Sequence, residues 1–253
     1  MKTPYISIFY IKIFILFFSL NLFAFGQEDA TESKSDTLVF KQKYGLRLGA
    51  DISKLVRTAI DDDYSGFELR ADYRLTKKIY VAGELGFEEK TTDTDAINLT
   101  AEGSYFKAGL DYNFYQNWLD MENMIFSGIR VGASTFSQTR NSFSVYNVNN
   151  QYWNNQVTVI DGEKFDGLTA LWLELIAGIR AEIFNNFFMG ANVQLKFLIN
   201  ETSSDDFENL FIPGFNRTYD SGRIGAGFTY TISYLIPIFK KDKIVVQESD
   251  SNE

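Results

Sequence analysis

Apolar and polar side chains alternate with a period of two through most of the chain beyond residue 43. This alternation is typical of β-strands that present one face to an apolar medium and the other to a polar one. It recurs in eight segments, and each of them predicts one strand of an all-β protein. The segments are 44–53, 66–74, 79–88, 106–114, 128–135, 171–183, 189–197 and 223–236.

The charged side chains of these segments all fall on one face of each strand. An enclosed set of charges must balance, because a buried unpaired charge costs on the order of several kcal/mol. Here eight positive and eight negative charges balance, so we expect them to fill a polar interior as ion pairs. The sixteen residues are Arg47, Asp51, Glu68, Arg70, Asp72, Arg74, Glu84, Glu88, Lys107, Asp111, Arg130, Glu174, Arg180, Glu182, Lys196 and Arg223.

Short and long connections alternate between the predicted strands. The connections at 75–78, 115–124 and 185–186 are short or compact, whereas those at 54–65, 89–100, 136–168 and 200–222 are longer and polar. Short turns at one end and long loops at the other are typical of an eight-stranded antiparallel up-and-down transmembrane β-barrel. A barrel of this strand number encloses side chains rather than an open channel.

Aromatic residues fall near both ends of the predicted strands, on the face without charges. Two such rows are typical of the girdles that flank the apolar band of a membrane barrel. The row near the short turns is Tyr44, Tyr73, Tyr112, Phe114, Phe184, Phe187 and Tyr234, and the row near the long loops is Phe67, Phe87, Phe106 and Phe197.

The first 26 residues have the features of a secretory signal peptide. An apolar stretch follows Lys2 and ends at Ala24-Phe25-Gly26, before a polar run. Ala24 and Gly26 are the two small residues that a signal peptidase requires, so they predict cleavage after Gly26. An uncleaved membrane anchor is the alternative. The expected organisation is then a signal peptide at 1–26, a periplasmic linker at 27–43, the barrel at 44–239 and a charged periplasmic tail at 240–253.

Composition excludes several kinds of chemistry. The chain contains no cysteine and no histidine, which removes thiol catalysis, His general bases and His- or Cys-bound metals. Its net charge of −9, without basic clusters, argues against nucleic acid as a partner. We therefore expect no enzyme activity, no cofactor and no metal.

Asp61, Asp62 and Asp63 could bind a divalent cation, but the run lacks the Gly and distal Glu of a calcium loop, and a solvated tip is the alternative.

The long connection 136–168 is the segment most suited to a specific interaction. Phe143, Tyr146, Tyr152 and Trp153 are interleaved with asparagines, a mixture that also serves antibody loops. Alternation in 142–145 and 157–159 predicts that the two flanking strands continue as a hairpin. Two roles stay open, recognition of a surface glycan or protein and a packed lid that seals the barrel mouth.

Together with the signal peptide, the alternating strands and the closing segment Tyr234-Leu235-Ile236-Pro237-Ile238-Phe239, the chain resembles small outer-membrane β-barrels of Gram-negative bacteria. In particular it resembles an uncharacterised Bacteroidota family known as a domain of unknown function. The resemblance implies a monomer in the outer membrane whose partners are membrane lipid, lipopolysaccharide and the barrel-assembly machinery. A secreted soluble barrel that binds an apolar ligand is one alternative, and a lipid-modifying barrel enzyme is another.

Overall fold

The computed structural model describes residues 37–115, 122–145, 157–203, 209–217 and 222–246. The predicted signal peptide lies outside these residues. The described elements are β1 (Thr37–Asp51), α2 (Ile52–Ile60), β2 (Tyr64–Arg74), β3 (Ile79–Asp93), β4 (Ile97–Asn113), β5 (Met124–Val145), β6 (Val157–Phe184), β7 (Phe187–Glu201) and β8 (Ile224–Val246). The chain divides into two compact units, and the unit Val39–Lys243 contains the barrel.

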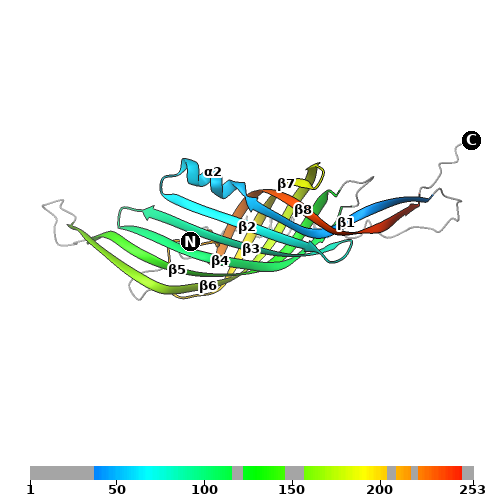
Figure 1. Cartoon of the computed structure of the whole chain (residues 1–253). Helices are drawn as coiled ribbons and strands as arrows, with labels where there is room; N and C mark the ends of the chain where they lie inside the picture. The colour runs from blue at the N-terminus through cyan, green and yellow to red at the C-terminus, as the bar shows by residue number, and fades with distance from the viewer. Residues whose placement is uncertain (1–36, 116–121, 146–156, 204–208, 218–221, 247–253) are drawn as a thin grey trace, which may run out of the picture. The chain divides into compact units, whose positions relative to one another are not determined.

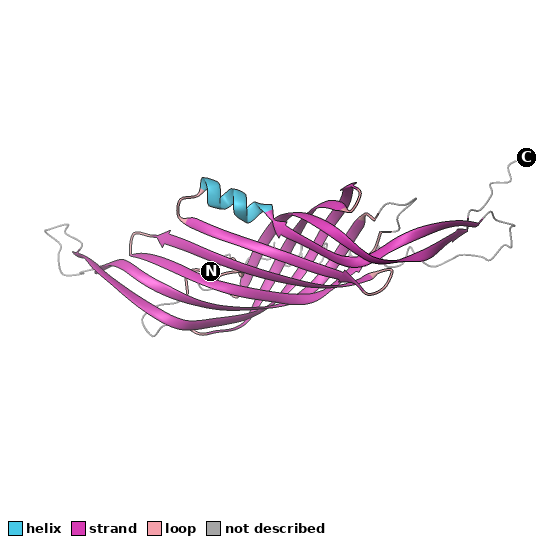
Figure 2. Ribbon diagram, viewed as in Figure 1, coloured by secondary structure: helices cyan, strands magenta, loops and turns pink. Residues whose placement is uncertain are grey.

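The strands close into a barrel in sequence order, from β1 to β8 (Figures 1 and 2). Consecutive strands from β1 to β8 pair antiparallel, and the register places Leu69 opposite Leu85 and Leu110 opposite Ile129. Because side chains alternate across a strand, this register puts apolar residues of neighbouring strands side by side on one face. The expected all-β antiparallel architecture is confirmed.

Apolar side chains cover the outside of the ring, and charged and polar side chains lie inside together with buried apolar clusters. One outward residue near the middle of each strand shows the pattern, with 42–64% of its surface exposed. These residues are Leu48, Leu69, Leu85, Leu110, Ile129, Leu175, Val193 and Phe228. Each of the first six has a buried charged neighbour in the chain on the inner face, such as Arg70, Glu84 and Arg130. We call the outward set the apolar belt. A soluble barrel that binds an apolar ligand would have the reverse arrangement, with apolar side chains inside and charges outside, so the exposure of these residues argues against that alternative.

One member of the expected aromatic girdles is buried instead of exposed. Tyr44 is only 3% exposed. Its ring lies under the guanidinium of Arg74 at 4.8 Å and stacks on Phe239 at 5.2 Å. A cation is attracted by the negative charge on an aromatic face, so the contact with Arg74 favours the buried position of Tyr44.

Several strands are longer than the alternation indicated. β3 continues to Asp93 and β4 begins at Ile97, so the expected long loop 89–100 is only a three-residue turn. The expected linker and tail also contain strand residues, since β1 begins at Thr37 and β8 ends at Val246. The extension of β3 has polar side chains on both faces, such as Thr91 and Thr92, so it carries no apolar alternation to predict it. The extension of β4 does alternate, but there the apolar residues Leu99 and Ala101 are the buried ones, which is the opposite phase to the rest of the strand.

The first connection contains a helix that was expected to be loop. Ile52, assigned to the first strand, instead begins α2. Asp51 ends β1 and caps the helix, because its Oδ1 accepts a hydrogen bond from the backbone N–H of Ser53 at 2.8 Å. At the other end, the backbone N–H of Asp61 donates to the carbonyl of Arg57.

Two glycines make room for the largest aromatic side chains inside the barrel. Gly86 is paired with Tyr105, and Gly132 is paired with Trp172. A Cβ atom at Gly132 would lie 2.2 Å from Cε2 of Trp172, and one at Gly86 would lie 2.2 Å from the ring of Tyr105. Trp172 is fully buried, so its ring has no free space to move into.

We expect Gly132→Ala to destabilise the protein by about 1–3 kcal/mol, because the added methyl group overlaps a fixed indole ring. Gly83→Ala is the matched control, since a Cβ there meets nothing closer than 3.7 Å. The measurement is urea unfolding of the refolded protein followed by circular dichroism. Equal unfolding midpoints for the two variants would contradict this account of the interior packing.

Candidate functional site

A network of ion pairs occupies the interior of the barrel, and Glu84 on β3 lies at its centre. The Glu84 carboxylate lies 2.6 Å from Nζ of Lys107, 3.3 Å from Nη1 of Arg70 and 3.6 Å from Nε of Arg130. Asp111 on β4 binds the same two arginines, at 3.0 Å and 2.7 Å. Four neighbouring strands, β2 to β5, therefore share one set of buried charges.

Two further groups extend this network along the interior. Toward the short turns, the carboxylate of Asp72 lies 2.8 Å from the guanidinium of Arg47 and 3.1 Å from that of Arg180. Toward the other end, Lys107 lies 3.1 Å from the carboxylate of Glu68, and the hydroxyl of Tyr105 donates to Glu68 at 2.6 Å. These carboxylates have close cationic partners, which offsets the cost of removing them from water.

The inner face of β7 and β8 is polar but less charged. Asn192 donates from Nδ2 to the hydroxyl of Thr229 at 2.5 Å, and Gln194 donates to Oδ1 of Asn192 at 3.0 Å. Lys196 is the buried cation on this side, and it lies 3.9 Å from the carboxylate of Glu174 on β6. Glu174 also lies 3.8 Å from Lys107, so it connects the two sides of the interior.

Fourteen of the sixteen expected interior charges are buried, and the exceptions are Glu182 and Arg223. Glu182 lies at the end with the short turns, where it is partly exposed and pairs with Lys43 at 3.2 Å. Arg223 is exposed, and its Nη2 donates to the carbonyl of Ile199 at 2.7 Å. Its expected place inside was wrong, because β8 begins one residue later and the alternation does not extend to Arg223.

Lys54 supplies an interior charge that sequence reasoning missed. Its ammonium group pairs with Glu88, which also accepts a hydrogen bond from the hydroxyl of Tyr64 at 2.6 Å. Lys54 lies on α2, so a search confined to strands with a period of two could not find it. Glu122 was also missed, and it binds Arg74 at 2.7 Å near the short turns.

Part of the last connection folds into the barrel mouth. We call residues 209–217 the plug segment. The backbone N–H of Gly214 donates to Oε2 of Glu88 at 2.5 Å, and its carbonyl accepts a hydrogen bond from Nζ of Lys196 at 2.7 Å. Gly214 has φ of +81°, and a Cβ there would lie 2.6 Å from the ring of Tyr105. Only glycine fits this position without strain.

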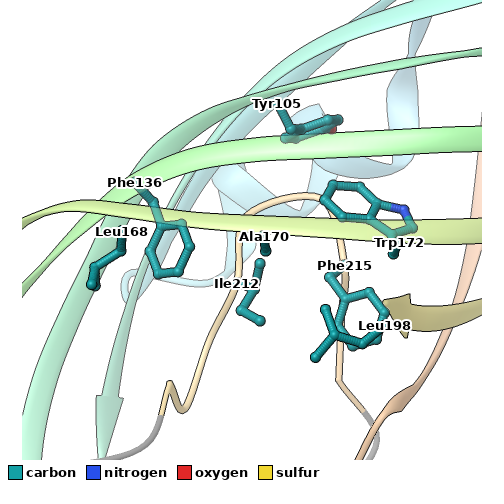
Figure 3. Packing of buried hydrophobic residues seen from close by; sticks show 8 residues of the cluster. All are labelled: Tyr105, Phe136, Leu168, Ala170, Trp172, Leu198, Ile212 and Phe215. Carbon is teal, nitrogen blue, oxygen red and sulfur yellow. The ribbon is translucent and has the colours of Figure 1, made fainter. Parts of the chain in front are cut away.

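Apolar side chains hold the plug segment in place. Ile212 and Phe215 are fully buried in a cluster with aromatic and aliphatic residues of β4 to β7 (Figure 3). The rings of Phe215 and Trp172 meet edge to face, with centroids 6.0 Å apart. The connection 200–222 was expected to be a polar loop, and part of it is instead an apolar plug. The other members of the cluster are Tyr105, Phe136, Leu168, Ala170 and Leu198.

The expected β-hairpin at the end of β5 and β6 is present. Phe143 pairs with Val159, and Val145 pairs with Val157. Arg140 lies 4.8 Å from the Phe143 ring centroid and 5.6 Å from that of Phe165. Tyr146, Tyr152 and Trp153 lie outside the described residues. Phe136 and Leu168, at the base of the hairpin, belong to the apolar cluster.

The hairpin base carries an exposed ion pair. Nζ of Lys164 donates to Oε1 of Glu102 at 2.8 Å. This hydrogen bond lowers the pKa of the Glu102 carboxyl below its ordinary value, although burial acts weakly in the opposite direction. Because both side chains are in contact with water, the pair contributes little to stability.

The acidic run of the first connection lies at the end of α2. Asp61 accepts a hydrogen bond from Nε of Arg57 at 3.1 Å and ends α2, while Asp62 and Asp63 are exposed. Among the residues that the structure describes, no three acidic side chains converge as metal ligands would. Within the same residues, every helix is too short or too polar to cross a membrane.

We expect Glu84→Gln to destabilise the protein by about 3–5 kcal/mol, because it leaves three buried cations with too little negative charge. Glu102→Gln is the control, since it breaks an exposed pair and should change the free energy of unfolding little. Both are measured by denaturant unfolding. A Glu84 variant as stable as the Glu102 variant would refute a cooperative network.

The fold and the site together define a class of protein, the closed antiparallel β-barrel with an ion-paired interior, a plugged mouth and an apolar exterior. The chain belongs to the family described as a domain of unknown function, DUF6048, whose model matches residues 6–241. Membership in a domain-of-unknown-function family agrees with the resemblance found from sequence, while the Bacteroidota origin stays a prediction.

Among solved structures, the crystal structure of Ail, the attachment invasion locus protein of Yersinia pestis, is similar to this chain. The TM-score is 0.35 and the sequence identity is 9%, over 80% of this chain and 99% of that chain. No curated protein matches the chain.

Proposed function

We propose that the protein is an eight-stranded transmembrane barrel of the outer membrane that acts as a structural or surface-interaction protein rather than as an open porin or an enzyme. The observation that carries this proposal is the apolar belt. Apolar side chains on the outside and charges on the inside invert the arrangement of a water-soluble protein. Lipid is the medium that favours such a surface, and the strands of a closed barrel pair their backbone groups with one another.

The closed interior supports a role other than transport. The ion pairs around Glu84 and Asp111 fill the middle of the barrel, and the plug segment occupies one mouth. A chain without histidine or cysteine also lacks the side chains most often used for hydrolysis of lipids or peptides. The interior carboxylates serve as ion-pair partners for the interior cations, so they support a structural role.

The hairpin of β5 and β6 supports a surface-interaction role. A lid that seals the mouth was the alternative, but the paired part of the hairpin lies beyond the apolar cluster, to which its base contributes Phe136 and Leu168 and the plug segment contributes Ile212 and Phe215. The paired residues 142–145 and 157–160 form a ladder, and Ile160 is 85% exposed. We propose that this hairpin extends from the outer surface of the cell and contacts a glycan or a protein. Membrane lipid, lipopolysaccharide and the assembly machinery are the other proposed partners of a monomer.

The location has a direct test. We expect the mature protein to fractionate with outer membranes and to migrate faster on SDS gels when unheated than when boiled, because a folded barrel resists the detergent. Recovery of the mature protein as a soluble periplasmic species would refute the proposal.

Val193→Arg tests the lipid contact of the apolar belt. Val193 is 61% exposed and pairs with Phe228 on β8, so an arginine there would face the middle of the membrane. We expect a loss of about 2–4 kcal/mol in the free energy of unfolding from lipid vesicles. Thr158→Arg on the hairpin is the control and should have little effect. The idea fails if both arginines are tolerated equally.

The closed interior predicts that the protein does not conduct ions across a membrane. In planar bilayers we expect purified protein to give no steady conductance, because ion pairs and the plug segment fill the bore. A stable conductance from the unaltered protein would contradict this prediction and favour a porin. Protein denatured by boiling is the control for nonspecific leakage.

A further inference from the structure

α2 takes the place of a strand in part of the barrel wall. The last pair of the ladder between β1 and β2 is Ala50 with Leu69, and β1 ends at Asp51. β2 extends further, to Tyr64, where β3 is its strand partner. The edge of β2 between Tyr64 and Glu68 therefore lacks β1, and α2 lies beside it (Figure 1).

A side chain of the helix forms hydrogen bonds with backbone groups on the edge of β2 that lacks a strand partner. The backbone N–H of Gly66 donates to Oγ1 of Thr58 at 2.9 Å, and the same hydroxyl donates to the carbonyl of Gly66 at 3.1 Å. Nearby, the guanidinium of Arg57 lies 4.0 Å from the centre of the Tyr64 ring. These contacts join the polar face of the helix to the wall.

The two faces of α2 match the two faces of the barrel. Lys54, Arg57 and Thr58 follow helical spacing on one side, and Lys54 reaches Glu88 in the interior. Leu55, Val56 and Ile60 lie on the opposite side, with 49%, 51% and 78% of their surfaces exposed. A helix on the surface of a soluble protein would present these faces the other way round.

The apolar face of α2 continues the apolar belt. On β1, Leu48 is exposed on the outside just before the helix begins. On β2, Leu69 is exposed at the last pair with β1, and Phe67 is exposed where the helix replaces the strand. A helix pairs its own backbone N–H and C=O groups, so it can interrupt a strand ladder in lipid without leaving them unsatisfied.

From this arrangement we propose that α2 is a helical section of the membrane wall, whose apolar face of Leu55, Val56 and Ile60 contacts the acyl chains of the outer leaflet. The inference rests on the proposed membrane location. An amphipathic helix of this kind lies at the interface with its apolar side in the acyl region. The helix thus acts as a lipid-contact surface as well as a carrier of Lys54.

Single cysteines provide the test, because the natural chain has none. Leu55→Cys and Ile60→Cys carry an environment-sensitive nitrobenzoxadiazole label on the apolar face, and both residues are exposed, so neither substitution empties a core site. Val193→Cys on the apolar belt and Ile160→Cys on the hairpin are the lipid and water controls. Each variant is refolded into phosphatidylcholine vesicles, and folding is checked by the shift on unheated gels.

Quenching by doxyl-labelled lipid and by aqueous iodide then separates the outcomes. We expect labels at 55 and 60 to lose fluorescence to doxyl lipid as the label at 193 does, and to be protected from iodide. If they respond to iodide as the label at 160 does while 193 stays quenched by lipid, the helix inference is overturned and the membrane location stands. If the label at 193 is not quenched by lipid, the membrane location fails and the helix inference fails with it.

Discussion

The balance of charge inside a narrow ring is the constraint on which the rest of the structure depends. Arg70, Lys107 and Arg130 surround Glu84, and each cation also binds a second carboxylate. Such a set holds together only while every member is present, because each buried charge relies on its neighbours for the interaction that water would otherwise supply. The strands that carry these residues are thereby fixed in one register. A shift by one residue would move every charge to the apolar side.

The same constraint explains why two features outside the strands are needed. Lys54 on α2 brings a cation to Glu88, and the plug segment brings the backbone N–H of Gly214 to the same carboxylate. The apolar cluster around Trp172 and Phe215 then closes the space beyond the charges. Helix, plug and strands form one interior, in which ion pairs occupy the middle and an apolar cluster lies beyond them.

Sequence reasoning located the strands and most of the interior, because alternation is a local signal that each strand carries in its own residues. It placed Arg223 wrongly, since the pattern could not show that β8 begins one residue later. It missed α2, although Ile52, Leu55 and Val56 follow helical spacing, because Ile52 also continues the alternation of β1. The plug could not be predicted at all. Its position depends on Glu88, Lys196 and Tyr105, which are far from Gly214 in the chain.

That separation has a consequence for the order in which the protein forms. The hydrogen bond from Gly214 to Glu88 joins residues 126 positions apart, and Lys196 on β7 holds the carbonyl of Gly214. Contacts between distant parts of a chain carry the largest loop-closure cost and form slowly. The plug can take its place only after β3 and β7 belong to the same ring. Docking of the plug segment therefore follows the closure of the strands on which it rests.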